Sequence, residues 1–387
     1  MRSWQRLPRS TRRNHQCLPT QSTAAQVAQG SECFSSARQE LRNIVRDGLH
    51  PANATLGFGT ILAVSHIQSP RRRSLLWAAN LTDLEVVIPD QEDWTEGDVQ
   101  NFRAKEGSSI SKGSALAWLG HLDALRWFLN TTHETALIIE DDVDWDMSIR
   151  QTQIPLLAAA VRVLLANNSS DTGYWSHASN WDLLYPGHCD DLLSPSTYLA
   201  HPHLLYRDDT TPQHTLLHPD TFNFLHSFAL PEGTRFLHRA FWPFCTFAYA
   251  VTRRSASLIL AHLSRELEGG TSAFDVALLA SCRDLDWRCW SVSPELFHHT
   301  QGQSEISRAD GNGDVEVGAK RATRATWNIG CGARHAQLWM DESDVVGRRE
   351  LKALVEGIVE RGECPVDGVE EEKGWKGCEW GECGAQS

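Results

Sequence analysis

The sequence predicts an α/β fold, with one main domain built on a mainly parallel central sheet that is flanked by helices. Three observations predict it. From Leu56 onward, short apolar runs alternate with stretches of helical periodicity, which is the rhythm of β-α-β units. The runs at 60–64 and 136–139 are almost continuously apolar, as in strands buried on both faces. With 387 residues, the chain is long enough to bury a sizeable core.

Each expected element follows from its local pattern. The apolar runs predict strands at 60–64, 84–88, 136–139, 181–185, 245–251 and 290–292. Apolar residues at spacings of three and four predict helices at 39–47, 71–80, 115–129, 154–166, 255–267, 274–282 and 349–360. Ser111 or Ser114 can cap the helix at 115–129. Residues 201–244 show no periodicity, and we expect them to form loops that carry part of the site.

Composition and charge divide the chain into three expected segments. Residues 1–54 are a basic, polar lead-in that we expect to be disordered in part, residues 55–340 are the main domain, and residues 341–387 are an acidic helix and tail. The first segment lacks the apolar stretch of a secretory signal, so we expect a basic arm or an incomplete start. The net charge of −13 argues against a nucleic-acid partner. No apolar run reaches the roughly 18 residues of a membrane span, so we expect no integral membrane segment.

The cysteines and sequons bear on the compartment. Ten Cys occur without a CxxC framework, and the closest pairs, Cys282/Cys289 and Cys378/Cys383, would permit disulfides in an oxidising compartment. Five Asn-x-Ser/Thr sequons, at Asn53, Asn80, Asn130, Asn167 and Asn168, would be used only in a secreted chain.

A cluster of carboxylates follows the apolar run at 136–139 directly. It consists of Glu140, Asp141, Asp142, Asp144 and Asp146. In sheets of this class, ligands bind at the carboxyl ends of the strands. Hard cations such as Mn²⁺ or Mg²⁺ take several oxygen ligands, and a diphosphate can complete the shell. The structural alternative is a solvated acidic loop at the start of the next helix.

Several segments together resemble glycosyltransferase family 25, the lipopolysaccharide and collagen galactosyltransferase relatives. The run from Ala136 to Val143, ALIIEDDV, looks like the family's LEDDV signature, and the helix GSALAWLGHL from Gly113 resembles another family motif. The Arg-rich segment VSHIQSPRRR from Val64 is similar to the family's first loop. Further segments that look like the fungal members are WDLLYPGHC, TFAYAV, FDVAL, PELFHHT and SEI, and the resemblance covers 56–306.

The resemblance implies a GT-A fold and a metal-dependent transfer of a hexose, with inversion. The donor would be a UDP-sugar, commonly UDP-galactose or UDP-glucose, the metal Mn²⁺ or Mg²⁺, and the acceptor a carbohydrate or glycoprotein. Relatives in eukaryotes generally work in the lumen of the secretory pathway. On this interpretation Glu140 and Asp142 bind the metal, with His298 or His299 as a further ligand. For either histidine, a simple loop contact is the alternative.

The remaining candidates surround the donor and the acceptor. Asp275 is the candidate base that takes the acceptor's proton, or else a carboxylate at a helix N-terminus. Asp182 and Asp190 are weaker candidates for the base. The expected donor-side residues are Ser65, Arg72, Arg73, Gly113, His121 and Asp141; Arg71 also belongs to the Arg run, which alternatively is only an exposed helix start. Trp175 is the expected platform for the acceptor.

Three other functions stay open. The family usually has Ser where this chain has Gly120, and Asp where it has Glu305, so a catalytically inactive relative is one alternative. A secreted carbohydrate-binding module with a structural Ca²⁺ is another, although such modules are usually all-β. A hydrolase that uses two carboxylates is the third.

Overall fold

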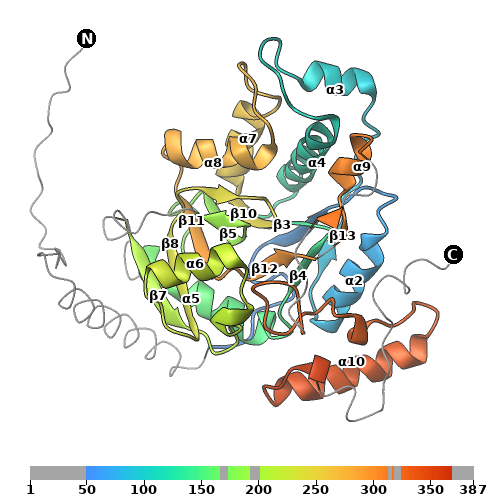
Figure 1. Ribbon diagram of the computed structural model, residues 1–387, viewed down its shortest axis with the longest axis vertical. Helices are drawn as coiled ribbons and strands as arrows, with labels where there is room; N and C mark the ends of the chain where they lie inside the picture. Colours follow the sequence, from blue (N-terminus) through green and yellow to red (C-terminus); the bar gives the residue numbers. More distant parts are fainter. Residues whose placement is uncertain are drawn as a thin grey trace, which may run out of the picture.

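The computed structural model describes residues 49–165, 173–191, 201–300, 302–312, 316–317 and 324–367. Its centre is an eight-stranded sheet in the order β2-β1-β3-β10-β5-β11-β8-β7, with helices on both faces (Figure 1). The strands are β1 (Thr60–Val64), β2 (Val86–Val87), β3 (Thr135–Glu140), β5 (Leu183–Gly187), β7 (His203–Arg207), β8 (Thr234–Arg239), β10 (Ala248–Thr252) and β11 (Cys289–Ser293). The predicted α/β class is confirmed.

The sheet is mixed, whereas the sequence predicted a mainly parallel one. Strands β2, β1 and β3 are parallel to one another, as are β5 and β11. Strand β10 runs antiparallel to both β3 and β5, and β8 runs antiparallel to both β11 and β7. An apolar run has the same appearance in either direction, so the pattern could not reveal these reversals.

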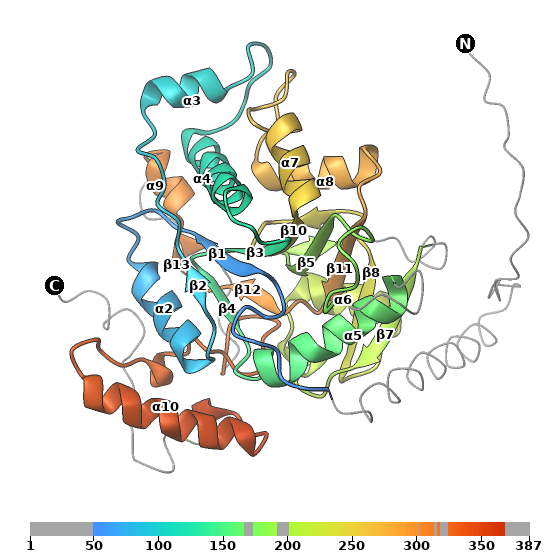
Figure 2. The ribbon, with the colours of Figure 1, turned by 180° about the vertical axis from the view of Figure 1, so that it is seen from behind.

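Alternate residues of the central strands pack on opposite faces of the sheet. Leu137 and Ile139 of β3 join the core beneath helices α2 (Arg71–Leu81), α5 (Ile154–Leu165) and α10 (Val345–Glu360). Ala136 and Ile138 join the core beneath α4 (Lys112–Leu129), α7 (Arg253–His262) and α8 (Phe274–Asp284). Figure 2 shows the two helix layers from the opposite side. The fold therefore has three layers, with β3 at its centre.

Shorter elements complete the described chain. The remaining helices are α3 (Glu96–Phe102), α6 (Pro219–Ser227) and α9 (Glu305–Ala309), with single turns at Ile149–Gln153, His214–Leu216 and Ala336–Leu338. Three two-stranded sheets pair β4 (Val143–Trp145) with β12 (Phe297–His299), β6 (Asp190–Asp191) with β9 (Pro243–Phe244), and β13 (Gly302–Gln303) with β14 (Glu316–Val317). The predicted helix at 39–47 lies outside the described residues.

The expectation of loops throughout 201–244 is wrong. This stretch contains β7, α6, β8 and β9, and β7 and β8 form one edge of the main sheet. The apolar pattern of β8 is broken by Arg235, which is nevertheless buried because its guanidinium pairs with Asp208 at 2.6 Å. A paired polar residue inside a strand hides the alternation that sequence reasoning looks for.

The C-terminal helix shares the core of the main domain. Helix α10 packs against α2 (Figure 2), and its residues Leu351, Val355 and Ile358 are buried in the same core cluster. A disulfide between Cys331 and Cys364 links the segment after this helix to the loop before it. The acidic tail beyond 367 lies outside the described residues.

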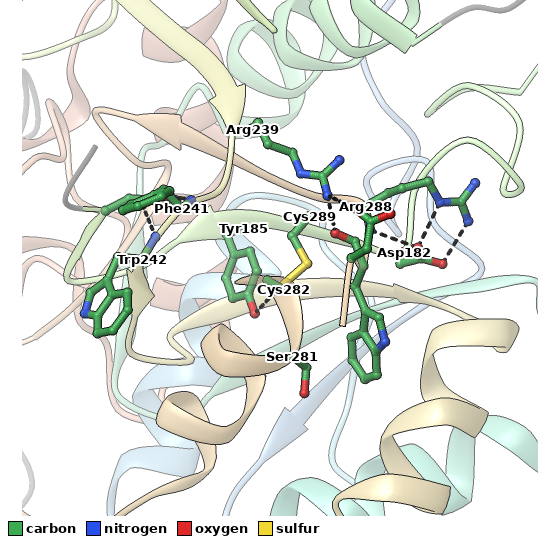
Figure 3. The surroundings of a disulfide bond; sticks show 12 residues. Asp182, Tyr185, Arg239, Phe241, Trp242, Ser281, Cys282, Arg288 and Cys289 are labelled. Atoms are coloured by element: carbon green, nitrogen blue, oxygen red, sulfur yellow. Dashed lines mark hydrogen bonds and ion pairs between the residues drawn. A yellow bond between two sulfur atoms is a disulfide. The ribbon is translucent and has the colours of Figure 1, made fainter. Parts of the chain in front are cut away.

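Two further disulfides connect the central strands to their surroundings. Cys282–Cys289, one of the pairs suggested by spacing, joins the end of α8 to the start of β11 (Figure 3). Cys189–Cys245 joins the segments that follow β5 and precede β10. Cys378 and Cys383 lie outside the described residues. None of the helices in the described part of the chain combines the length and the apolar character needed to cross a bilayer.

Candidate functional site

The acidic cluster forms a turn between β3 and β4, at the carboxyl end of β3. Glu140 is the last residue of β3, its amide donates to the carbonyl of Phe247 at 3.0 Å, and Asp141 and Asp142 make the turn. We call Glu140, Asp141 and Asp142 the acidic turn. Its three carboxylates face different partners, and these partners decide what each one can bind.

Asp141 is fully engaged by the protein. Its Oδ2 accepts a hydrogen bond from Ser65 Oγ at 2.6 Å, and its Oδ1 lies 3.3 Å from Nη1 of Arg71. The Arg334 guanidinium donates to the carbonyls of Asp141 and Val143 at 2.7 and 2.9 Å. Ser65 and Asp141, both expected on the donor side, therefore meet, but in the structure they bind each other. Their contact fixes the shape of the turn.

Glu140 lies between two polar side chains of neighbouring elements. Its Oε1 accepts a hydrogen bond from Thr246 Oγ1 at 2.6 Å and lies 3.6 Å from Nε2 of His121. Burial alone would raise the pKa of Glu140, but the interactions with His121 and Thr246 outweigh it and hold the pKa below its ordinary value. Glu140 is therefore a carboxylate at neutral pH. The imidazole of His121 is buried between Tyr249 and Phe274, so His121 would influence a bound ligand only through its contact with Glu140.

Asp142 has an oxygen without a protein partner. Its Oδ2 lies 3.1 Å from Nη1 of Arg71, whereas its Oδ1 is buried and accepts no hydrogen bond. Burial and the charge of Glu140 raise the pKa of Asp142 to about 7, against the pull of Arg71. A buried carboxylate oxygen without a donor is costly and unusual in a folded protein. Among the three carboxylates, Asp142 is the one with a buried oxygen that has no hydrogen-bond partner.

The pairing of β4 with β12 brings the strand that carries the two histidines next to the acidic turn. His299 lies opposite Val143, and the amide of Thr300 donates to the carbonyl of Asp142 at 2.6 Å. The charge of Glu140 acts on His299, and burial together with His298 lowers the pKa of His299 to about 4. The His299 ring is therefore neutral at neutral pH and keeps a lone pair. The backbone of β12 thus lies next to the acidic turn, whereas binding of a metal by these histidines stays a prediction.

His298 is held away from the acidic turn by another group. Its Nδ1 lies 2.5 Å from Oε1 of Glu295, and its ring packs against those of His218 and Phe247, with centroids 6.1 and 5.3 Å apart. Of the two candidate ligands, His299 is the one whose electrostatic interaction contributes to the lowered pKa of Glu140. His298 faces the side of the site that α6 contributes.

Asp275 lies near the acidic turn, at the start of α8. Its Oδ2 accepts from the amide of Cys245 at 3.0 Å and its Oδ1 from the amide of Val276 at 2.7 Å. Burial raises the pKa of Asp275, the two backbone donors oppose the rise, and the charge of Glu140 adds to it. Asp275 is thus a carboxylate in the first turn of α8, where the N-cap is Ala273, and its pKa is raised in the direction that suits a base.

The other donor-side candidates have separate environments. Arg72 donates to Ser65 at 3.2 and 3.0 Å, so it braces the end of β1. Arg73 is exposed, and its charge acts on Asp341 rather than on the acidic turn. Gly113 packs against the backbone of Ile306 in α9, where a Cβ would clash with the carbonyl. Neither Arg73 nor Gly113 contacts the acidic turn.

Three further expectations concern residues outside the acidic turn. Trp175 is not an exposed platform: it is buried, stacks on Phe58 at 4.7 Å and donates to the carbonyl of Leu56. Asp182 precedes β5, at the end of the sheet opposite the acidic turn, and it accepts from Arg288 at 2.9 Å (Figure 3). Asp190 lies in β6, where burial raises its pKa to about 6.

Sequence reasoning missed several residues that shape the site. Thr246 and Glu295 lie in the segments TFAYAV and PELFHHT, but no role was predicted for either residue or for Arg334. The three residues contact the site across separations of 106, 3 and 193 residues. Only Glu295 had a local signal, because it lies three residues before His298. The other two contacts depend on the fold, and no spacing in the sequence could have found them.

The acidic turn offers carboxylate oxygens to a cation, but not a complete set of metal ligands. Among the described residues, no three His, Cys, Asp or Glu side chains are arranged to hold a metal ion by themselves. Mg²⁺-type sites, however, commonly use one or two carboxylates together with substrate phosphates. Glu140 and the unpaired Oδ1 of Asp142 are the carboxylate groups that such a site would use. No protein-family model matches the chain, and no curated protein matches it.

Proposed function

We propose that the chain is a metal-dependent glycosyltransferase with a GT-A fold. It would transfer a hexose, galactose or glucose, from a UDP-sugar to an acceptor hydroxyl with inversion. The observation that carries the proposal is the buried, unpaired Oδ1 of Asp142 beside the carboxylate of Glu140, at the carboxyl end of a central strand. Two carboxylates at this place provide the oxygen ligands that Mn²⁺ or Mg²⁺ takes when it holds a diphosphate.

The residues around the acidic turn suit this chemistry. A divalent ion held by Glu140 and Asp142 would offset the charge on the departing diphosphate. Arg71 bridges Asp141 and Asp142, so it places a cation within reach of the same phosphates. Thr246 and His121 keep Glu140 ionised and oriented. The neutral ring of His299 would be a further nitrogen ligand only if it moved to the ion on binding, because it does not form a three-ligand group with the carboxylates as it stands.

Asp275 is the proposed base. The acceptor hydroxyl would give its proton to an oxygen of Asp275 as the acceptor oxygen attacks the anomeric carbon. The bond between that carbon and the diphosphate oxygen breaks, and the bonding electrons leave with the diphosphate. Each oxygen of Asp275 accepts one backbone hydrogen bond, and a carboxylate oxygen has two lone-pair sites. Asp275 therefore retains the capacity to receive a proton.

A catalytically inactive relative is the second candidate, and one observation favours it. Arg71 lies 3.3 Å from Asp141 and 3.1 Å from Asp142, so the protein itself supplies a cation to the acidic turn. In an inactive relative this arginine would replace the metal. In an active enzyme, Arg71 would turn toward the phosphates when the cation binds.

A donor-hydrolysis screen tests the proposal. Purified protein with Mn²⁺ is given a panel of nucleotide sugars, and the release of nucleotide is measured. We expect UDP release from one donor, dependent on metal, and reduced more than about a hundredfold by Asp142→Asn, since the bound ion contributes several kcal/mol. Asp284→Asn, at an exposed residue that pairs with Arg283, is the matched control. Absence of nucleotide release from every donor would favour the inactive relative.

A further inference from the structure

A completely buried carboxylate lies behind the two histidines of the site. Glu295 has no exposed surface, and its Oε1 is 2.5 Å from Nδ1 of His298. Its Oε2 is buried and has no hydrogen-bond partner. A buried carboxylate is expensive to maintain and contributes little to stability by itself. The fold therefore retains Glu295 at a cost in free energy, and the titratable group that its carboxylate contacts is His298.

Asn328 holds Glu295 in place. Its side-chain amide donates to Oε1 of Glu295 at 2.6 Å and to Thr221 Oγ1 at 2.9 Å, and its Oδ1 accepts from the amide of His218 at 2.8 Å. Asn328 has a positive φ of 64°, a backbone conformation that Asn tolerates better than most residues. The amide thus links the start of α6 to Glu295 and fixes the direction of the carboxylate.

The backbone of Glu295 is fixed as firmly as its side chain. Arg235 donates from Nη1 to the carbonyls of Pro294 and Glu295 at 2.6 and 3.1 Å. Burial alone would raise the pKa of Glu295, but the hydrogen bonds from His298 and Asn328 outweigh it, so the pKa lies below its ordinary value. In the geometry itself, Oε1 of Glu295 already accepts from the amide of Asn328 and faces Nδ1 of His298 as an acceptor. The nitrogen of His298 that faces it must therefore carry a proton.

The two adjacent histidines consequently have different surroundings. His299 is in the electrostatic range of Glu140, whereas His298 lies between Glu295 and the ring of His218, which caps α6. With the proton on Nδ1, a neutral His298 ring has its lone pair on Nε2. A hydrogen bond from one ring nitrogen to a carboxylate sets which nitrogen of a histidine carries the proton.

We propose that Glu295 is a positioning residue that fixes His298 in the Nδ1-protonated form, so that Nε2 accepts a hydrogen bond from a hydroxyl of the sugar acceptor. The proposal rests on the proposed transferase function for the identity of the ligand, and it assigns His298 to the acceptor rather than to the metal. The side of the site formed by α6 and the loop of Asn328 would then be the acceptor side.

Nitrogen NMR of the histidine rings tests the positioning directly, without any activity. In metal-free protein labelled at histidine, we expect the Nδ1 signal of His298 to be that of a protonated nitrogen and the Nε2 signal that of an unprotonated one. Glu295→Gln, whose amide oxygen can still accept, should retain this form. Glu295→Leu, which has no acceptor, should change it, while the His299 signals stay as they are.

Methyl galactoside and methyl glucoside serve as acceptor probes in the same samples. We expect one of them to shift the Nε2 signal of His298 in a saturable way, with about tenfold weaker binding in Glu295→Leu, as for the loss of one hydrogen bond. A proton on Nε2 in the unaltered protein would overturn the positioning, even if the leucine variant fails to fold. A correct tautomer whose Nε2 signal responds to neither glycoside would overturn the assignment to the acceptor. If the donor screen alone fails, the proposed transferase function is wrong, but the positioning of His298 by Glu295 is still supported by the NMR result.

Discussion

Replacing Asp142 by Asn should stabilise the metal-free protein at the same time as it removes ligand binding. Asp142 has one buried oxygen without a partner and lies beside Glu140, which disfavours its charged form. An amide of the same shape removes this charge. A residue whose loss increases stability while abolishing binding is one that the fold keeps for function.

The magnitude follows from the shift in pKa. The pKa of Asp142 is raised from 3.8 to about 7, so its contribution to stability is fully present below about pH 4 and is lost as the pH rises through 7. A rise of roughly three units corresponds to an upper limit of about 4 kcal/mol above that pH. Because Glu140 shares the repulsion, we expect Asp142→Asn to be more stable by about 2 kcal/mol at pH 8 and equal to the unaltered protein near pH 4.

Urea unfolding in EDTA at several pH values measures this difference. Asp141→Asn is the matched control, because Asp141 accepts from Ser65 and pairs with Arg71. We expect that variant to be less stable by about 2 kcal/mol, since hydrogen bonds to a charged group are lost. If Asp142→Asn is as destabilised as Asp141→Asn at pH 8, the reasoning about the unpaired oxygen is wrong.

Two further predictions concern residues away from the acidic turn. Burial would raise the pKa of Asp182, but hydrogen bonds from Arg288 outweigh burial and lower this pKa. The carboxylate should therefore stabilise the fold above pH 3.8, the ordinary pKa, and this stabilisation should be lost as the pH falls through the lowered pKa. In Asp182→Asn, the free energy of unfolding measured in urea should fall less steeply as the pH is lowered into the acid range. An unchanged pH dependence would contradict this. Gly113→Ala should destabilise by about 1–3 kcal/mol, because the added Cβ meets the carbonyl of Ile306. Gly357→Ala in α10 is the control and should stabilise slightly; similar melting temperatures for the two alanine variants would refute the close packing at Gly113.

The strands nearest the site were predictable from sequence because they are buried on both faces. β1 matches its expected range, and β3 extends the expected run by one residue at each end. The edge strands β7 and β8 were not predictable, because their polar residues are buried in pairs such as Arg235 with Asp208. Strand direction was also hidden, since the hydrophobic pattern of a buried strand does not change when the strand is reversed.

The position of the acidic turn at the carboxyl end of β3 was predictable, but the different surroundings of its carboxylates were not. Asp141 and Asp142 are adjacent and chemically identical in the sequence. Their difference arises from Ser65 and Arg71, which lie 76 and 70 residues away from Asp141 and satisfy it while leaving Oδ1 of Asp142 unpaired. The division between His298 and His299 has the same origin, because it depends on Glu295 and on the pairing of β12 with β4. Such distinctions follow from tertiary contacts.

Calorimetric titration of UDP into the protein, with and without Mn²⁺, tests the central claim most directly. The acidic turn should bind UDP together with Mn²⁺, and Mn²⁺ should be required because Glu140 and Asp142 would otherwise repel the diphosphate. Asp142→Asn, which we expect to be folded and stable, should show no such binding. Heat of binding that is the same in the absence of Mn²⁺, or the same in Asp142→Asn, would contradict the assignment of the acidic turn as the metal–nucleotide site.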